Sequence, residues 1–364
     1  MMPARDAHRL LDVLVVDDSA VVRQALGAIL RQAPGMTVTA AADPIIAMDK
    51  MRRRRPDVIV LDLEMPRMDG LSFLRKVMSE GPLPVVVCSG VAGRGTEAAL
   101  RAMEEGALEV IAKPKLAVRE FLEESAILIV DAVRGAAAAR LHPGRQPVRA
   151  RPLAGATPQP PARHALRVTT DKVVAIGAST GGTEALSEIL QAMPPDAPGM
   201  VIVQHMPDVF TRSFAERLDR LCRVEVSEAA TGDRVTPGRA LVAPGNRHTV
   251  VVRTGAHYEV EVQDGPLVSR HRPSVDVLFC SIAQAAGPNA LGVILTGMGD
   301  DGADGLLEMR RAGAATIAQD EESCVVFGMP KAAIDRGAAD SVVPLAGIPG
   351  AILRRSATWA GVRE

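Results

Sequence analysis

The chain has 364 residues, which is enough for two or three domains. Its 42 Lys and Arg residues nearly balance its 43 Asp and Glu residues, so the net charge of −1 disfavours binding of nucleic acid through bulk positive charge. Apolar residues make up 47% of the chain but aromatic residues only 2%, which favours α/β layers over an aromatic-rich β-sandwich.

The four cysteines are dispersed along the chain and form no C-x-x-C pair. This spacing disfavours a zinc site or a redox dithiol and fits a reducing compartment. There is no run of about 18 apolar residues, and the polar N-terminus does not resemble a signal peptide. We therefore expect a soluble cytoplasmic protein without membrane insertion and without a nucleic-acid partner.

Strand and helix patterns alternate through the first 125 residues. Short runs rich in β-branched residues predict buried parallel strands at 11–16, 38–41, 58–61, 85–87 and 109–112. Amphipathic patterns predict helices at 21–31, 44–54, 71–79, 96–105 and 116–132. Five βα units in this length predict a five-stranded doubly wound α/β domain at residues 1–125.

The composition changes between residues 126 and 170, where 11 Ala, 6 Pro and 7 Arg accompany one acidic residue. We interpret this segment as the end of a helix followed by a flexible linker. Its basic charge allows contact with an acidic surface, but a solvated tether is the simpler interpretation.

A second α/β pattern occupies residues 171–364. Strands are predicted at 173–176, 200–204, 240–243, 257–262, 290–295 and 315–318. Helices are predicted at 183–191, 212–221, 274–285 and 305–311. The alternation predicts a doubly wound, mostly parallel sheet in this domain as well.

Polar residues follow four of the predicted strands in the first domain. Asp17 and Asp18 follow the first strand, Asp62 the third, Ser89 the fourth and Lys113 the fifth. Because the carboxyl ends of parallel strands meet at one edge of a sheet, these groups are expected to converge. Clustered carboxylates suit Mg²⁺, and a carboxylate beside Mg²⁺ can accept a phosphoryl group that a lysine and a hydroxyl then bind.

This segment closely resembles a two-component receiver domain, through VVDDS, LDLEMPRMDG and IAKP. The resemblance implies phosphorylation of Asp62 and switching through Ser89 and Lys113. It also implies four Mg²⁺ ligands: Asp17, Asp18, Asp62 and the Glu64 carbonyl. Val110 stands where many receivers carry an aromatic residue, so the resemblance does not extend to a switch by aromatic rotation.

Residues of three types, Ser, His and Asp, lie at predicted strand ends of the second domain and could cooperate in nucleophilic catalysis. Ser179 lies in GASTG, which satisfies the G-x-S-x-G pattern of a strand-to-helix turn that exposes a serine. His205 follows the next strand, and Asp300 and Asp301 follow a later one. The motif alone is equally compatible with a phosphate-binding loop, and the order Ser–His–Asp differs from that of α/β-hydrolases.

A dinucleotide-binding site is the main alternative. Gly297, Gly299 and Gly302 match G-x-G-x-x-G after a strand, and Asp320 lies near the spacing of a ribose-binding acid. This fingerprint normally opens its domain, however, whereas here it lies in the last quarter of the chain. It also leaves Ser179 and His205 without a role.

The second domain closely resembles the catalytic domain of the chemotaxis response-regulator protein-glutamate methylesterases. The resemblance is carried by GASTGGTEAL, QHMPDVFTRSFAERL, RHRPSVDVLF, GVILTGMGDDGADG and ESCVVFGMP. It implies Ser179 as nucleophile, His205 as general base and acid, and Asp301 as the orienting carboxylate. It also implies oxyanion stabilisation by the N–H groups of Thr180 and Met298.

The resemblance to this family implies a serine esterase that is activated by phosphorylation. It would remove methyl groups from glutamate methyl esters, and deamidate certain glutamines, on chemotaxis receptors during signalling adaptation. A chemotaxis sensor histidine kinase would donate the phosphoryl group with Mg²⁺, and the ester chemistry would need no cofactor. Two alternatives remain open here: a receiver-regulated NAD-dependent enzyme, and a receiver joined to a non-catalytic interaction domain.

Overall fold

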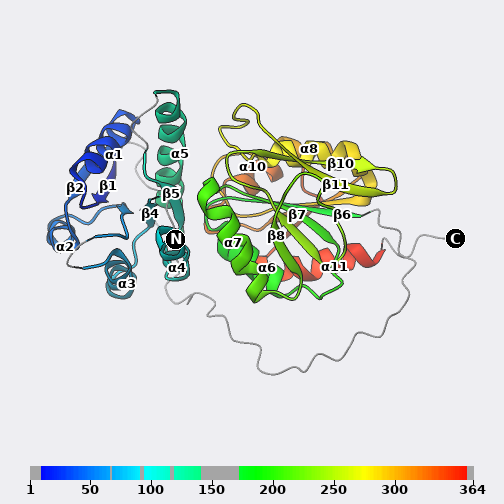
Figure 1. The fold of residues 1–364 in the computed structure, drawn as a ribbon, viewed down its shortest axis with the longest axis horizontal. Helices are drawn as coiled ribbons and strands as arrows, with labels where there is room; N and C mark the ends of the chain where they lie inside the picture. The colour runs from blue at the N-terminus through cyan, green and yellow to red at the C-terminus, as the bar shows by residue number, and fades with distance from the viewer. Residues whose placement is uncertain (1–9, 66–67, 91–93, 115–118, 141–171, 359–364) are drawn as a thin grey trace, which may run out of the picture.

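A computed structural model describes residues 10–65, 68–90, 94–114, 119–140 and 172–358. The described residues form two α/β domains that lie side by side, and helix α5 (Arg119–Ala138) runs along the boundary between them (Figure 1). The predicted fold class is confirmed for both domains.

The N-terminal domain contains a five-stranded parallel sheet in the order β2-β1-β3-β4-β5. Both faces of its central strands are apolar, as expected for a sheet covered by helices on both sides. The strands are β1 (Leu11–Val16), β2 (Met36–Ala41), β3 (Val58–Leu61), β4 (Val85–Ser89) and β5 (Glu109–Ala112).

Alternate residues of these strands enter different cores. Val13 and Val15 pack in a cluster with α1 (Ala20–Gln32) and α5. Leu14 and Val16 face a cluster that includes α3 (Gly70–Glu80) and α4 (Arg94–Glu104). Helix α2 (Pro44–Arg53) contributes Ala47 to that second cluster. The two-residue alternation of a strand therefore distributes the helices over both faces.

The C-terminal domain is built on a seven-stranded sheet in the order β14-β13-β12-β6-β7-β9-β8, in which each strand pairs in parallel with its neighbours. Its strands are β6 (Val173–Ala178), β7 (Gly199–Gln204), β8 (Glu225–Glu228), β9 (Arg239–Val242), β12 (Ala290–Ile294), β13 (Ala315–Gln319) and β14 (Ser341–Val343). A separate antiparallel hairpin joins β10 (His248–Thr254) to β11 (His257–Gln263).

Helices cover both faces of this second sheet. One core contains apolar residues of α8 (Val275–Ala286), α9 (Ala303–Arg311) and α10 (Met329–Asp335), together with the hairpin. The opposite core contains residues of α6 (Gly182–Gln191), α7 (Asp208–Leu221) and α11 (Ile348–Thr358). Among the described helices, none combines the length and apolarity required to cross a membrane.

The structure differs from the expected elements at several places. Strands β8, β10 and β14 and helices α10 and α11 were absent from the sequence prediction. Helix α5 continues to Ala138, six residues beyond the expected end at 132, because an alanine-rich run supports helix without an amphipathic pattern. The flexibility predicted for the linker falls on residues 141–171, which lie outside the described residues.

Candidate active site and phosphorylation site

Ser179 lies in a tight turn between strand β6 and helix α6. Its N–H donates to the Thr296 carbonyl at 3.0 Å, and its own carbonyl accepts from Gly182 N–H at 2.7 Å. Gly181 adopts φ +79°, and a Cβ on Gly182 would stand 2.2 Å from the Gln204 side chain. The glycines of the motif are therefore required to place the serine at the N-terminus of α6.

His205 is placed beside Ser179 by the register of two neighbouring strands. Ala178 pairs with Gln204, and each is followed directly by one of the two candidate residues. His205 N–H donates to the Ala178 carbonyl at 3.1 Å. The Gln204 side-chain amide donates to the carbonyl of Ser179 at 3.0 Å and to that of His205 at 3.1 Å, which fixes the two segments together.

The Asp301 carboxylate lies against the His205 ring, with 2.8 Å between Oδ2 and Nε2. Asp301 also accepts from the Ser274 hydroxyl at 2.7 Å and from the N–H groups of Val275 and Asp276 at 2.8 and 3.1 Å. Burial alone would raise the pKa of Asp301, but these hydrogen bonds, the one with His205 foremost, lower it to about 2. Asp301 is therefore ionised at neutral pH.

An ionised carboxylate only accepts hydrogen bonds, so Nε2 of His205 must carry the proton that it shares with Asp301. In a neutral imidazole the other nitrogen, Nδ1, is then the acceptor. Nδ1 is buried and has no hydrogen-bond partner among the described residues. The basic lone pair of the ring is therefore available on the side away from Asp301.

A second histidine that sequence analysis had not assigned to the site stacks on the first. The rings of His205 and His271 lie 3.8 Å apart, centroid to centroid, at 11°. Burial, and then the nearby His205, lower the pKa of His271 to about 3. His271 therefore stays neutral and presents a flat, uncharged surface to the His205 ring. One sequence signal marks His271, which lies in the RHRPSVD segment two residues before Pro273.

Thr180 and Met298 both line the cavity that contains Ser179. The loop carrying Met298 approaches closely because Gly297 has no side chain; a Cβ there would stand 2.7 Å from the Ser179 Cβ. The position of both residues is compatible with the expected oxyanion role, which stays a prediction.

The G-x-G-x-x-G segment forms the loop that carries Asp301. A Cβ on Gly302 would stand 2.4 Å from a methyl group of Val275, whose N–H binds Asp301, so this glycine permits close packing against α8. Asp320 accepts hydrogen bonds from the backbone N–H and hydroxyl of Ser323, at 3.0 and 2.5 Å. Both features of the dinucleotide hypothesis thus have local structural roles.

The carboxylates of the first domain converge as expected. Val16 pairs with Leu61, so Asp17 and Asp62 follow neighbouring positions of β1 and β3. Ligand oxygens of Asp17, Asp18 and Asp62 all lie within 4.8 Å of one another. Such a set of hard oxygen donors fits Mg²⁺.

Lys113 contacts two of these carboxylates. Its Nζ lies 2.7 Å from Asp62 Oδ2 and 3.2 Å from Asp17 Oδ2. Burial raises the pKa of Asp62, and the hydrogen bond from Lys113 offsets part of this effect. Burial would lower the pKa of Lys113, but its hydrogen bond and attraction to Asp62 outweigh this effect and raise it.

The remaining predicted receiver residues lie around this cluster. Ser89 ends β4 and is buried, and its carbonyl accepts from Lys113 N–H at 3.0 Å. Glu64 N–H donates to Asp62 Oδ1 at 3.2 Å. Val110 is buried and lines the cavity between the domains. The position where many receivers carry an aromatic residue therefore faces the catalytic domain.

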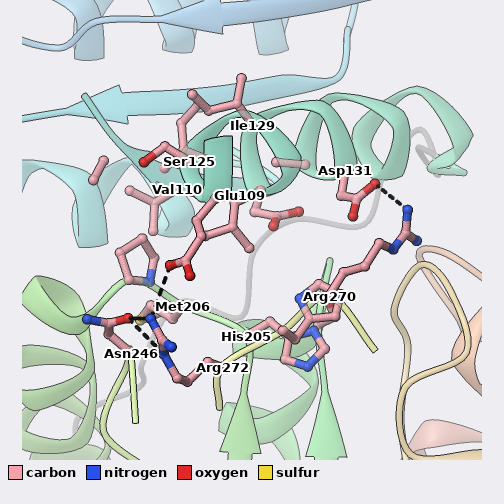
Figure 2. Close-up of a pocket in the computed structure, with 18 of the residues that line it drawn as sticks. Glu109, Val110, Ser125, Ile129, Asp131, His205, Met206, Asn246, Arg270 and Arg272 are labelled. Carbon is pink, nitrogen blue, oxygen red and sulfur yellow. Dashed lines mark hydrogen bonds and ion pairs between the residues drawn. The ribbon is translucent and has the colours of Figure 1, made fainter. Parts of the chain in front are cut away.

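Ser179 opens into a cavity of about 380 Å³ whose walls come from both domains (Figure 2). The β5 residue Glu109 accepts a hydrogen bond from the Thr180 hydroxyl at 2.7 Å, next to the candidate nucleophile. Burial raises the pKa of Glu109 to about 7 against the lowering effect of that hydrogen bond. No sequence pattern pointed to this contact, which joins positions 71 residues apart.

Comparison with known proteins gives two family matches. The CheB methylesterase family matches residues 174–352, and the response regulator receiver domain matches residues 13–126. Two curated relatives come from Anaeromyxobacter dehalogenans. Protein-glutamate methylesterase/protein-glutamine glutaminase 5 is 62% identical over 95% of this chain and 97% of its own length. Protein-glutamate methylesterase/protein-glutamine glutaminase 1 from the same organism is 63% identical over 96% of this chain and 99% of its own length.

The chain belongs to the CheB methylesterase family. The solved catalytic domain of the Thermotoga maritima CheB methylesterase is 39% identical to this chain. It matches 50% of this chain and 97% of its own length, with a TM-score of 0.49. The two family matches and the two curated relatives confirm the resemblance expected from sequence, and membership of the CheB methylesterase family makes the chain an esterase with a receiver domain ahead of its catalytic domain.

Proposed function

We propose that this chain hydrolyses glutamate methyl esters on chemotaxis receptors and deamidates certain receptor glutamines, under the control of phosphorylation at Asp62. The observation that carries the catalytic assignment is the pairing of His205 Nε2 with Asp301 at 2.8 Å; among the described residues, Nδ1 of the same ring has no hydrogen-bond partner. These groups match the nucleophile, base and orienter that acyl transfer requires.

The reaction proceeds in two halves. Ser179 Oγ attacks the γ-carbonyl carbon of the ester while His205 Nδ1 accepts the serine proton. The C–O bond to the methoxy group then breaks, and His205 returns the proton so that methanol leaves. Water, activated by the same nitrogen, attacks the acyl-serine and releases glutamate and free Ser179. A glutamine side chain follows the same route with ammonia as the leaving group.

Asp301 and the oxyanion groups stabilise the charges that develop in this sequence. The ionised Asp301 lies against the ring that becomes an imidazolium. The N–H groups of Thr180 and Met298 donate to the carbonyl oxygen as it gains negative charge. Neutral His271 stacks on His205 without adding like charge.

In the receiver domain, we assign the phosphoryl group to Asp62. Asp17, Asp18, Asp62 and the Glu64 carbonyl would hold Mg²⁺, which when bound neutralises charge on the transferred phosphoryl group. Lys113, now paired with Asp62, would bind the added phosphate, and Ser89 would donate a hydrogen bond to it. The phosphoryl donor is a chemotaxis sensor histidine kinase, and the reaction takes place in the cytoplasm.

Strand β5 couples the two sites because it carries contacts at both ends. Lys113 follows its last residue and pairs with Asp62, whereas Glu109 is its first residue and binds Thr180. A phosphoryl group that repositions Lys113 therefore acts on a strand that contacts the catalytic domain four residues earlier. Phosphorylation would shift the population from this docked form to one in which substrate reaches Ser179.

Methanol release from methylated receptor membranes tests this proposal. Wild type, Ser179→Ala and Asp62→Asn would be assayed with and without a small phosphodonor and Mg²⁺. Release by wild type should increase with phosphodonor, release by Asp62→Asn should stay low, and Ser179→Ala should release none. Methanol release by Ser179→Ala would refute the nucleophile assignment, and phosphodonor activation of Asp62→Asn would refute the phosphorylation site.

A further inference from the structure

The two walls of the cavity between the domains carry opposite charge. The catalytic wall includes two arginines, Arg270 and Arg272, and one carboxylate, Asp208, which accepts from the N–H of its neighbour Val209. The receiver wall carries three carboxylates and one lysine, namely Glu109, Glu124, Asp131 and Lys113. The catalytic domain thus presents a basic rim around Ser179 to an acidic surface.

Two carboxylates of helix α5 form ion pairs with the arginines of this rim. Asp131 Oδ1 lies 3.3 Å from Arg270 Nη1 (Figure 2). Glu124 Oε2 lies 3.1 Å from Arg272 Nη2. The two acids are seven residues apart, so they project from the same face of α5, about 10 Å apart along its axis. The structure therefore shows how a helix with carboxylates at this spacing fits across the entrance to the site.

Both arginines are tied to the catalytic machinery by their neighbours. Arg270 directly precedes His271, which stacks on His205. Arg272 donates to the Asn246 side-chain oxygen from Nε at 3.0 Å and from Nη2 at 2.7 Å, and also to the Gly265 carbonyl. The Arg272 side chain is only 17% exposed in the docked form, and its hydrogen bonds to Asn246 and Gly265 hold the guanidinium within the catalytic domain. A fixed guanidinium loses little conformational entropy when a carboxylate binds.

We propose that Arg270 and Arg272 are substrate-recognition residues that bind acidic side chains near the target glutamate on a helical segment of the receptor. Helix α5 makes the same two contacts in the docked form and so imitates the substrate. This inference rests on the proposed esterase function and adds the chemistry by which the substrate is selected. When the receiver moves away, both arginines lose their carboxylate partners and become available to an acidic helix.

This arrangement links specificity to regulation. A neutral small ester makes no charge-assisted hydrogen bond to the arginines, whereas a helix with flanking carboxylates makes two. The receiver and the receptor also compete for the same groups, so substrate cannot bind fully while α5 is docked. Substituting an arginine should therefore affect receptor and small ester differently, whereas substituting its α5 partner should affect only docking.

The test compares kcat/KM for methylated receptor with kcat/KM for a small neutral ester, the γ-methyl ester of N-acetylglutamate amide. The full-length chain is assayed at saturating phosphodonor and Mg²⁺. Arg270→Gln is the main variant because Arg270 is 53% exposed and its removal should not disturb the fold. Arg270→Lys retains the charge. Arg272→Gln is the second variant, checked by thermal melting because Arg272 also holds Asn246.

Arg270→Gln should lower the ratio of receptor to small-ester kcat/KM at least tenfold, chiefly through KM, and Arg270→Lys should restore most of it. The matched controls, Asp131→Asn and Glu124→Gln, break the same ion pairs from the receiver side. They should raise activity without phosphodonor and keep the ratio within about twofold of wild type. An unchanged ratio in Arg270→Gln would overturn the inference, whereas a wild type that hydrolyses neither ester would overturn the esterase function beneath it.

Discussion

Gly135 of helix α5 lies against Thr180, the residue that follows the proposed nucleophile, Ser179. A Cβ at position 135 would stand 2.7 Å from the Thr180 hydroxyl oxygen and 3.5 Å from the Met298 Cβ. The absence of a side chain at position 135 therefore permits this close approach of the receiver to the catalytic domain.

Gly135→Ala should weaken docking of the receiver and raise the activity of the unphosphorylated chain. Thr180 cannot easily give way, because its hydroxyl also binds Glu109. Overpacking of this kind costs about 1–3 kcal/mol. A cost of 1–2 kcal/mol changes the ratio of docked to undocked forms by roughly 5- to 30-fold. Methanol release without phosphodonor measures this change.

Gly27→Ala is the matched control for this prediction. Gly27 lies in helix α1, where a Cβ would meet only the flexible end of Arg31. Both substitutions favour helix by roughly 1 kcal/mol, so only the contact with Thr180 distinguishes them. Equal unphosphorylated activities for the two variants would show that Gly135 does not control docking.

Glu109 should make docking depend on pH. Burial in the docked form raises the pKa of Glu109 from an ordinary 4.5 to about 7, while His205 lowers it and Asp131 raises it by smaller amounts. Between these values the docked form binds more protons than the undocked form, so docking is strongest at low pH and weakens as pH rises towards 7. Above about pH 7, Glu109 is ionised in both forms, and docking no longer changes with its titration.

The ratio of unphosphorylated to phosphorylated activity isolates this effect, because the pH dependence of the chemical step itself cancels in the ratio. The ratio should rise between about pH 5 and 7 in wild type. In Glu109→Gln it should stay low and flat, since an amide is neutral and its oxygen still accepts from Thr180. A wild-type profile that persists in Glu109→Gln would assign the pH dependence to another group.

The strand-end residues were predictable from sequence because topology alone brings them together. In parallel sheets the carboxyl ends of neighbouring strands share an edge, so Asp17, Asp62 and Lys113 had to converge once their strands were recognised. The same rule placed Ser179 beside His205. The pairing of His205 with Asp301 was implied by family resemblance, and the structure supplies its geometry.

The contacts between the domains were not predictable in this way. Asp131 and Arg270 are 139 residues apart in the chain and belong to separately folded units, so no local periodicity relates them. The sequence predicts Glu109 in a buried strand and gives no sign of a partner for its carboxylate. The contact with Thr180 forms only because the receiver is docked on the catalytic domain. Short elements were also missed: Glu225–Glu228 is a four-residue polar strand at the edge of the sheet, without an apolar signal.

The assignment of Asp301, rather than Asp300, as the orienting carboxylate leads to a paired prediction. Asp301 is buried and binds His205, Ser274 and two backbone N–H groups. Asp300 is 58% exposed and pairs with Arg336. Asp300→Asn should therefore retain close to wild-type methanol release at saturating phosphodonor, because a surface ion pair contributes at most about 1 kcal/mol to stability.

Asp301→Asn should reduce that release roughly 10³- to 10⁴-fold. The side-chain nitrogen of Asn would face a donor in either orientation: Nε2–H of His205 and the N–H of Val275 at the Oδ2 position, or the N–H of Asp276 at the Oδ1 position. When it faces His205, the ring proton is driven to Nδ1, and the nitrogen that must accept the serine proton is blocked. Nitrogen-15 NMR of the imidazole rings would report this tautomer directly. Equal losses in Asp300→Asn and Asp301→Asn would contradict the assignment.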